Sequence, residues 1–420
     1  MKSMGSGKIE QFTNEIAGAA ALFLTTLRQE WAPTTIIHHN DADGLCAAAV
    51  LMRAFTRLSL PANLLAVEKI HEVILDAIHR SHQPYVIYTD LAGQSSGLVG
   101  RYAAQSKLVV ILDHHLPGGK TPGHVLHLNP EHWGINGDTE VSGAAVSSLF
   151  ARELMRLAGV DPGDTRGELA LLAVLGAYGD GQLQERPLIG VNAMLLAEAF
   201  EHGFVREVGE NLVIPSLGEK SPKEVTEILN LLGSIGFYDH GAETAVRFLL
   251  GDDRQRALAM AASLSSLKKS LFEGELLRIR ELGLRESSRF HWIDVKDRFL
   301  PMGVKAIGLF LETLIAEDLV GPDRYVVGFQ HFPESVPGVG SIGLSLTKVS
   351  ARVPPQLREK IEHGLLPDLM KLFPEASGVV GGTADGCHRF SAASLIEQGR
   401  EEEFITALEQ ALSVKGQGSL

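Results

Sequence analysis

Residues 108–115 read LVVILDHH, and this stretch decides the predicted fold class. Its first five residues are all apolar, which predicts a strand that is buried on both faces of a sheet. Similar runs occur at residues 34–38 (TTIIH) and 85–89 (YVIYT). Further strands are expected at residues 63–68 and 125–128, and helices at residues 44–54, 70–82, 98–105, 142–157 and 166–178. Strands that alternate with helices predict an α/β domain built on a parallel sheet.

The second half of the chain predicts helices first and then a further α/β region. Residues 200–250 are expected to be mainly helical, with a loop at residues 215–222. Residues 254–280 contain no proline and one glycine, with apolar residues at helical spacing, so we expect one long connecting helix. Beyond it, strands are expected at residues 291–295, 325–329 and 341–346, and helices at residues 355–372 and, with some breaks, at residues 392–412.

The amino-acid composition disfavours membrane proteins and proteins built on a disulfide framework. The 420 residues carry a formal net charge of −13, with 45% hydrophobic and 21% charged residues, which is typical of globular domains. No apolar stretch approaches the roughly 18 residues of a membrane span, and the first residues lack the apolar core of a signal peptide. Cys46 and Cys387 are the only cysteines and cannot form a disulfide framework. We therefore expect a cytoplasmic protein with no membrane partner.

The charge is unevenly distributed along the chain. The acidic total disfavours a protein that coats long nucleic acid through charge alone. Residues 254–289, however, hold eight basic and four acidic residues. This local excess predicts either a solvated helix face or a basic wall that faces a polyanion.

Acidic and histidine residues follow three of the predicted strands. HNDADG at residues 39–44, Asp90, and DHH at residues 113–115 each come directly after a strand, and Asp180 follows a predicted helix. Parallel strands end at the same edge of a sheet, where ligands bind. We therefore expect these side chains to lie close together, although they are far apart in the sequence.

Carboxylates and imidazoles in this combination suit divalent metals. Mn²⁺ fits best, with Mg²⁺, Fe²⁺ and Zn²⁺ as alternatives, and the lack of a cysteine cluster disfavours a structural zinc site. Several carboxylates packed together repel one another unless cations offset their charge. A pair of metals bridged by one carboxylate removes this repulsion, and such pairs recur in enzymes that hydrolyse phosphoesters.

These motifs resemble those of the DHH phosphoesterase superfamily. The matching segments are HNDADG at residues 39–44, TD at 89–90, DHH at 113–115 and GAYGD at 176–180. The first segment is most similar to that of RecJ-like nucleases of the archaeal type. Pyrophosphatases and small-nucleotide phosphodiesterases of the superfamily usually carry a histidine four residues before the first aspartate, where this chain has Ile37.

The resemblance implies a role for each matching residue. It implies that His39 and Asp41 bind one metal, and that Asp43, His114 and Asp180 bind the other. It further implies that Asp90 bridges the two Mn²⁺ or Mg²⁺ ions and contacts the attacking water. Asp113 is expected to orient His114 through a hydrogen bond, and His115 to face the substrate phosphate.

The resemblance also implies a domain organisation. Residues 1–250 are expected to form a DHH catalytic domain with its core at about 30–200, residues 251–289 the connecting helix, and residues 290–420 a DHH-associated, substrate-binding domain. A glycine-rich segment there is expected to hold a phosphate through backbone N–H groups and two cationic side chains. Its candidate residues are Gly381, Gly382, Gly386, His388 and Arg389. The inserted Thr383-Ala384-Asp385 departs from the family pattern.

Three functions remain open at this point. The first is a metal-dependent exonuclease that acts on single-stranded DNA or RNA, or on short oligonucleotides. The second is a phosphodiesterase for cyclic dinucleotides or short oligonucleotides, or a pyrophosphatase. The third is a non-catalytic replication scaffold, which the complete set of metal ligands disfavours. A homodimer or a replication or repair partner is compatible with all three.

Overall fold

A computed structural model of the chain describes residues 2–81, 83–161, 163, 165–182, 187–384 and 386–416. The chain forms two compact units, Met1–Ala261 with Pro337–Val339, and Ala262–Val336 with Gly340–Leu420. Within the described residues, no helix has both the length and the apolar character that a membrane crossing requires.

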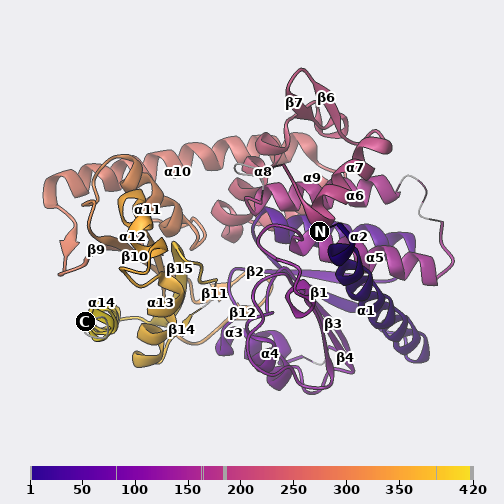
Figure 1. The fold of residues 1–420 in the computed structure, drawn as a ribbon, viewed down its shortest axis with the longest axis horizontal. Helices are drawn as coiled ribbons and strands as arrows, with labels where there is room; N and C mark the ends of the chain where they lie inside the picture. The colour runs from indigo at the N-terminus through magenta and orange to yellow at the C-terminus, as the bar shows by residue number, and fades with distance from the viewer. Residues whose placement is uncertain are drawn as a thin grey trace. The chain divides into compact units, whose positions relative to one another are not determined.

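The first unit is built on a parallel sheet of five strands in the order β2-β1-β3-β4-β5 (Figure 1). The strands are β1 (Thr34–His39), β2 (Ala62–Val67), β3 (Tyr85–Thr89), β4 (Leu108–Leu112) and β5 (Val125–Leu128). All residues of β3 and β4 are buried, as their continuous apolar sequences predicted. The parallel α/β fold is therefore confirmed.

The order of the strands reverses next to β1. The chain passes from β1 to β2 on one side and returns to place β3 on the other. In such sheets, the carboxyl ends of the strands beside a reversal form a crevice that binds ligands. HNDADG begins at the last residue of β1, and Asp90 directly follows β3.

Helices cover both faces of this sheet (Figure 1). One face carries α1 (Lys2–Gln29), α2 (Ala42–Arg57) and α5 (Gly143–Leu157), and the other carries α3 (Glu72–His79) and α4 (Ser96–Tyr102). The helix expected at residues 70–82 is thus shorter, and its last residue lies outside the described residues. Helix α1 had no sequence prediction. Its Phe23 packs against Phe55, Tyr85 and Phe150, with ring centroids 6.0–6.2 Å apart.

The segment after α5 is helical except for one hairpin. Its helices are α6 (Thr165–Gly179), α7 (Gly190–Glu201), α8 (Pro222–Asn230), the π-helical turn η3 (Leu231–Ile235), the 3-10 turn η4 (Phe237–Asp239) and α9 (Gly241–Leu249). Strands β6 (Arg206–Val208) and β7 (Asn211–Val213) pair antiparallel in a stretch that was predicted to be helical. They join through a two-residue turn in which Gly209 adopts φ +62°. Three-residue strands are too short to show an alternating pattern.

The connecting helix is observed as α10 (Arg254–Leu282), which confirms the sequence prediction. Part of its basic excess is paired with acids from elsewhere in the second unit. Arg280 lies 2.8 Å from Glu317, and Arg285, just beyond the helix, lies 3.0 Å from Glu402. These pairs favour the solvated-face interpretation for the end of α10.

The second unit contains a mixed sheet of six strands in the order β14-β15-β13-β10-β9-β8. The strands are β8 (Arg285–Glu286), β9 (Phe290–Lys296), β10 (Tyr325–Phe332), β13 (Leu346–Arg352), β14 (Thr383–Ala384) and β15 (Ser391–Glu397). A separate small pair is formed by β11 (Ser335–Val336) and β12 (Gly340–Ser341). The helices are α11 (Ala306–Ala316), α12 (Pro355–Glu362), α13 (Leu369–Val379) and α14 (Glu401–Gly416).

Three predictions for this unit were wrong in detail. The strand expected at residues 341–346 ends where β13 begins, because the sequence of β13, LTKVSAR, holds four polar residues and no apolar run. The helix expected at residues 355–372 is two helices, interrupted near Gly364, which adopts φ +72°. The helix expected at residues 392–412 begins with strand β15, since antiparallel pairing with β13 overrides the helical propensity of its alanines.

We predict that Phe23→Ala lowers the free energy of unfolding by about 3–5 kcal/mol, the usual cost of removing a buried aromatic ring. Phe23 is fully buried, and its neighbour Leu22 is 47% exposed. Leu22→Ala is therefore the matched control, with an expected loss below about 1 kcal/mol. Urea denaturation followed by Trp133 fluorescence measures both, because Trp133 donates a hydrogen bond to Glu15 of α1. Equal losses would contradict the docking of α1 through Phe23.

We also predict that His79 contributes to the free energy of unfolding at neutral pH and that this contribution is lost in acid. Burial lowers the pKa of His79 to about 4, and its Nε2 lies 2.7 Å from the Tyr88 hydroxyl. The unfolded chain binds this proton near pH 6.5, so the contribution is present above that pH and is lost as the pH falls toward 4. Between pH 7 and pH 5, the melting temperature of the wild type should fall further than that of His79→Gln. Parallel curves would show that His79 is not responsible.

Candidate metal centre

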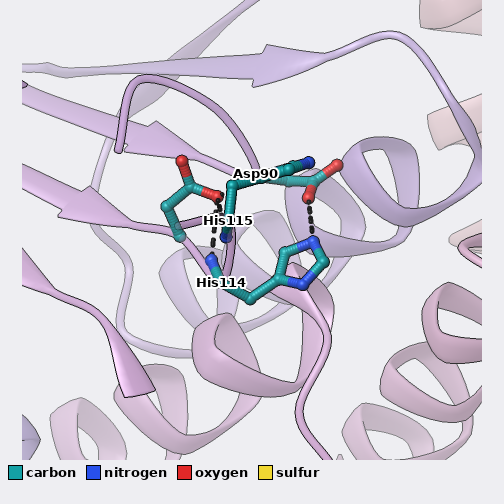
Figure 2. A group of neighbouring side chains, drawn as sticks. Asp90, His114 and His115 are labelled. Carbon is teal, nitrogen blue, oxygen red and sulfur yellow. Dashed lines mark hydrogen bonds and ion pairs between the residues drawn. The ribbon is translucent and has the colours of Figure 1, made fainter. Parts of the chain in front are cut away.

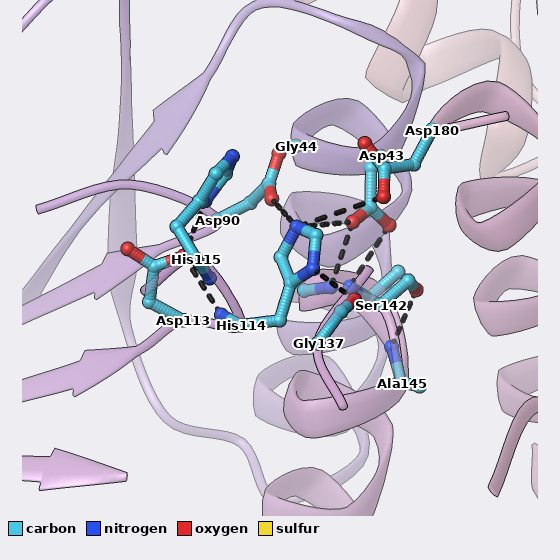
Figure 3. A network of polar contacts seen from close by, with 12 residues as sticks. Asp43, Gly44, Asp90, Asp113, His114, His115, Gly137, Ser142, Ala145 and Asp180 are labelled. Carbon is cyan, nitrogen blue, oxygen red and sulfur yellow. Dashed lines mark hydrogen bonds and ion pairs between the residues drawn. The ribbon is translucent and has the colours of Figure 1, made fainter. Parts of the chain in front are cut away.

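The predicted site residues of the first unit meet at the carboxyl edge of the parallel sheet (Figure 3). Among the described residues they form three groups whose ligand atoms lie within 4.8 Å of one another, one of which is Asp90, Asp113, His114 and His115. The other two contain the predicted metal ligands. The first group is His39, Asp41 and Asp90, and the second is Asp43, His114 and Asp180. The residues for which the resemblance implied metal binding thus lie close together, and their binding of metal stays a prediction.

The first group begins where β1 passes into α2. His39 ends the strand, and Asp41 is the N-cap of α2, where its Oδ1 accepts a hydrogen bond from the Gly44 N–H. The other oxygen of Asp41 lies 2.9 Å from His39 Nδ1, and Asp90 Oδ2 lies 3.6 Å from the same nitrogen. One oxygen of Asp41 thus fixes the turn while the other faces the group.

Asp43 of the second group is held by the start of α5. Its carboxylate accepts hydrogen bonds from the N–H groups of Gly143 (2.7 Å) and Ala144 (3.0 Å). A helix N-terminus favours a negative charge at this position. Gly176 of α6 also packs here, because a Cβ at that position would overlap Asp43 Oδ1. The glycine of the GAYGD segment therefore lets α6 approach the carboxylate.

Asp90 lies between the two groups in an uncommon backbone conformation. Its φ is +59°, and its side chain is buried. Left-handed backbone at a non-glycine residue costs about 1–3 kcal/mol and is typical of functional sites. A Cβ at position 143 would lie 2.5 Å from Asp90 Oδ1, so a glycine is needed there as well.

His114 presents its Nε2 to the carboxylate of Asp90 (Figure 2) and to those of Asp43 and Asp180 (Figure 3). The distances are 3.3 Å to Asp90 Oδ1 and 3.8 Å to one oxygen each of Asp43 and Asp180. Its Nδ1 lies 2.8 Å from the Gly137 carbonyl oxygen, which orients the ring. This backbone contact fixes the tautomer in which Nε2 is available to a metal.

Asp113 has a different role from the one expected. Its Oδ1 lies 2.7 Å from Nδ1 of His115, whereas it contacts His114 only through the backbone N–H. Its other oxygen accepts the Gly93 N–H. Burial acts to raise the pKa of Asp113, but His115 and these hydrogen bonds lower it well below its usual value. The first residue of the DHH triplet therefore orients the third, and Gly137 orients the second.

Asp180 is the most exposed of these acids, at 29% of its side chain. It directly follows α6, where the helix dipole disfavours a negative charge. Gln182 donates a hydrogen bond to its Oδ2 (2.8 Å) and another to the Gly137 carbonyl (2.8 Å). Gln182 thereby links Asp180 to the backbone group that orients His114.

The shifted pKa values at this centre favour the binding of cations. Burial raises the pKa of Asp43 to about 6, and burial with the charges of Asp43 and Asp41 raises the pKa of Asp90 far above its usual range. Burial lowers the pKa of His114, but the neighbouring acids outweigh this and raise it. Within the described chain, no Lys or Arg forms an ion pair with Asp43, Asp90 or Asp180.

The donor atoms fit a divalent metal. Asp90 Oδ1 and His114 Nε2 are both buried, and they face each other at 3.3 Å. A buried carboxylate oxygen beside a buried imidazole nitrogen offers two donor atoms to one cation. Carboxylate oxygens and imidazole nitrogens suit Mn²⁺, and carboxylates also suit Mg²⁺.

Sequence reasoning missed the groups that support the metal-ligand candidates. These are the N–H groups at the start of α5, the Gly137 carbonyl, and Gln182 with Asn192, whose amide donates to Gln182 Oε1 at 2.6 Å. Ser142-Gly143, a good helix N-cap followed by glycine, was the available signal for the first of them. Backbone carbonyls and a single glutamine leave no pattern in a sequence.

The glycine-rich segment lies in the second unit and differs from its expected role. The N–H groups of Gly381 and Gly382 donate to the carbonyls of Gly378 (3.3 Å) and Ser377 (2.8 Å), and Gly381 adopts φ +65°. These are the contacts that close a helix, so the two glycines end α13 rather than present N–H groups to a phosphate. Gly386 is half-buried, while His388 and Arg389 are exposed. Asp385 lies outside the described residues.

Comparison with known sequences supports the family suggested by the motifs. Residues 33–176 match the DHH family, N-terminal domain. An uncharacterised protein of Methanocaldococcus jannaschii is 28% identical over 177 residues, which is 41% of this chain. The aligned stretch spans only 38% of that relative's own length.

Solved structures share the fold of both units. RecJ of Thermus thermophilus in complex with Mn²⁺ matches 95% of this chain, with a TM-score of 0.64 and 20% identity, over 55% of its own length. An exonuclease RecJ bound to manganese matches 95% of this chain and 94% of its own, with a TM-score of 0.61 and 21% identity. At these identities the likeness shows the fold. Residues 33–176 thus match the DHH family, and the fold of the chain is similar to that of RecJ.

Proposed function

We propose that this protein is a two-metal phosphodiester hydrolase that degrades single-stranded DNA, RNA or short oligonucleotides from an end. The observation that carries the proposal is the pair of ligand groups around Asp90 and His114, in which the buried Asp43 and Asp90 form no ion pair with a Lys or Arg of the described residues. Two cations between them would lower the pKa of a water molecule and offset charge on the phosphate oxygens.

The ligands divide between two positions. His39 and Asp41 would hold the first ion, and Asp43, His114 and Asp180 would hold the second. Asp90 belongs to the first group and also lies 3.3 Å from His114 of the second, so it is the residue placed to bridge them. Mn²⁺ is the proposed ion, since two RecJ structures of this fold contain manganese, and Mg²⁺ is the alternative.

His115 is the proposed contact for the scissile phosphate. Its side chain is 23% exposed and is oriented by Asp113. Burial lowers the pKa of His115, but the Asp113 carboxylate raises it above its usual value, which favours the cationic imidazole that a phosphate prefers. Asp113 itself remains ionised and holds this ring in place.

Residues 290–420 are proposed to act as the DHH-associated, substrate-binding domain. His388 and Arg389 are exposed cationic candidates for a neighbouring phosphate, and Gly386 gives the loop before them φ +69°. Gly381 and Gly382 contribute by ending α13 just before this loop. Substrate length, polarity and the choice of DNA or RNA are questions for the assay below.

We predict that the wild type with Mn²⁺ shortens end-labelled single strands of about 2–20 nucleotides stepwise. Asp90→Asn and His114→Ala should each lower turnover by more than about 100-fold, because loss of an outer-shell partner alone costs 10–100-fold. Both variants should keep the far-UV spectrum of the wild type. His388→Ala should mainly raise KM.

Other results of this assay would support one of the alternative functions. Cleavage of cyclic dinucleotides or pyrophosphate alone would move the protein to the small-nucleotide phosphodiesterases or pyrophosphatases. Mn²⁺ binding without hydrolysis of any substrate would support the scaffold interpretation. Full activity in both ligand variants would rule out the metal assignment.

We further predict that Gly143→Ala weakens Mn²⁺ binding at least about 10-fold. The added Cβ would lie 2.5 Å from Asp90 Oδ1 and 2.7 Å from its Cβ, so the bridging side chain must move. Gly18→Ala in α1 is the matched control, because a Cβ there meets nothing within 4 Å. The control should stabilise the protein by up to about 1 kcal/mol and leave Mn²⁺ affinity unchanged. Unchanged binding in Gly143→Ala would contradict the placement of Asp90.

A further inference from the structure

The loop that carries the first metal group is attached to a part of the chain that matched no motif. Asn40 lies between His39 and Asp41, and its side chain is fully buried. Its amide nitrogen donates to Glu68 Oε1 (3.3 Å) and to the Gly233 carbonyl (3.0 Å). Both N–H groups of this amide therefore point away from the metal ligands on either side of it.

Glu68 is a buried carboxylate one residue beyond β2. It is 1% exposed, and its Oε2 accepts a hydrogen bond from the Tyr238 hydroxyl at 2.8 Å. Burial and the Glu68 charge raise the pKa of Tyr238 well above its usual value, so the phenol stays protonated and remains a donor. A buried carboxylate is costly unless such hydrogen bonds satisfy it, so Asn40 and Tyr238 are tightly coupled through Glu68.

The segment that supplies Tyr238 contacts the same loop twice more. Asn230 Oδ1 accepts a hydrogen bond from the Ala42 N–H at 3.1 Å. A Cβ at Gly233 would overlap the Asn40 carbonyl oxygen, so two backbones meet there. The turn Leu231–Ile235 between these contacts is π-helical, a conformation that is frequent at functional sites.

We propose that the chain of hydrogen bonds Tyr238–Glu68–Asn40 is a positioning device for the first metal group. It holds the 39–41 loop in the conformation that binds metal, and it sets the metal affinity of His39, Asp41 and Asp90. This inference rests on the proposed two-metal centre. Tyr238, Glu68 and Asn40 are positioning residues, since they act through the loop and not on the substrate.

The second metal group has its own support, which shares no residue with this chain. Asp180 and His114 are held through Gln182 and Gly137, and Asp43 through the start of α5. Loss of the Tyr238 hydroxyl should therefore weaken the first group selectively. A role limited to overall stability would weaken both groups equally or neither of them.

The test measures Mn²⁺ binding in two backgrounds that each keep one group. Asp180→Ala leaves the first group complete, and Asp41→Ala leaves the second complete. Tyr238→Phe, which keeps the ring and removes the hydroxyl, is added to each background and to the wild type. Titration with Mn²⁺ alone, followed by the EPR signal of the free ion, gives the dissociation constants without any substrate.

In the Asp180→Ala background, Tyr238→Phe should raise the Mn²⁺ dissociation constant about 10–100-fold, the usual effect of losing an outer-shell partner. In the Asp41→Ala background it should change less than about twofold. Tyr238→Phe in the otherwise wild-type chain should lose turnover at low Mn²⁺ and recover it as Mn²⁺ is raised.

Tyr85→Phe is the matched control. The Tyr85 hydroxyl donates to the carbonyls of Glu30 (2.5 Å) and Thr26 (3.1 Å), away from the centre. This variant should lower thermal stability and leave Mn²⁺ affinity unchanged. If Tyr238→Phe does not fold, Gly233→Ala displaces the same loop through the Asn40 carbonyl and should give the same selective loss.

Each outcome decides between the proposals. Equal effects of Tyr238→Phe in both backgrounds, or no effect in either, would overturn the positioning role while leaving the metal centre intact. Failure of the wild type to bind Mn²⁺ would overturn the proposed function itself. Selective weakening of the first group would establish residues 230–238 as part of the metal site.

Discussion

Mutual repulsion of carboxylates in a buried space is the constraint on which the first unit depends. Asp43 and Asp90 are almost fully buried, Asp180 is partly buried, and all three face one nitrogen of His114. Such a group is stable only where hydrogen bonds and cations offset its charge. These charges are brought together by the reversal of strand order beside β1, by the start of α5 and by the end of α6. Bound metal would offset the repulsion between them.

The structure offsets this charge mainly through its backbone. Two N–H groups of α5 hold Asp43, the loop after β4 holds Asp113, and the Gly137 carbonyl orients His114. Glycines at 143 and 176 let helices approach within contact distance of the acids. Rigid elements thus fix most of the ligand candidates, whereas the 39–41 loop is contacted by the side chains of Asn40, Glu68 and Tyr238. In the two-metal proposal, this difference would let the affinity of each metal position be adjusted separately.

The glycine-rich segment of the second unit uses its backbone N–H groups differently from the metal-ligand candidates of the first unit. The glycine-rich segment uses the N–H groups of Gly381 and Gly382 to end a helix, and leaves His388 and Arg389 exposed. The N–H groups of these two glycines are therefore already used within the chain. Arg280 and Arg285 near the end of α10 are already paired with Glu317 and Glu402, which reduces the positive charge expected there from the sequence.

The sequence by itself determined the parallel sheet, the long connecting helix and the two sets of metal-ligand candidates. Apolar runs and the residues that directly follow them are local features, and parallel strands bring their ends together. Strands β13 and β15 and the β6–β7 hairpin were missed, because pairing between distant segments overrides local propensity. Only the tertiary structure decided that Asp113 orients His115, that Gln182 supports Asp180 and that Tyr238 reaches Asn40 through Glu68. Most of these supporting contacts join atoms far apart in the chain, or involve backbone groups that every residue carries, so no sequence pattern encodes them.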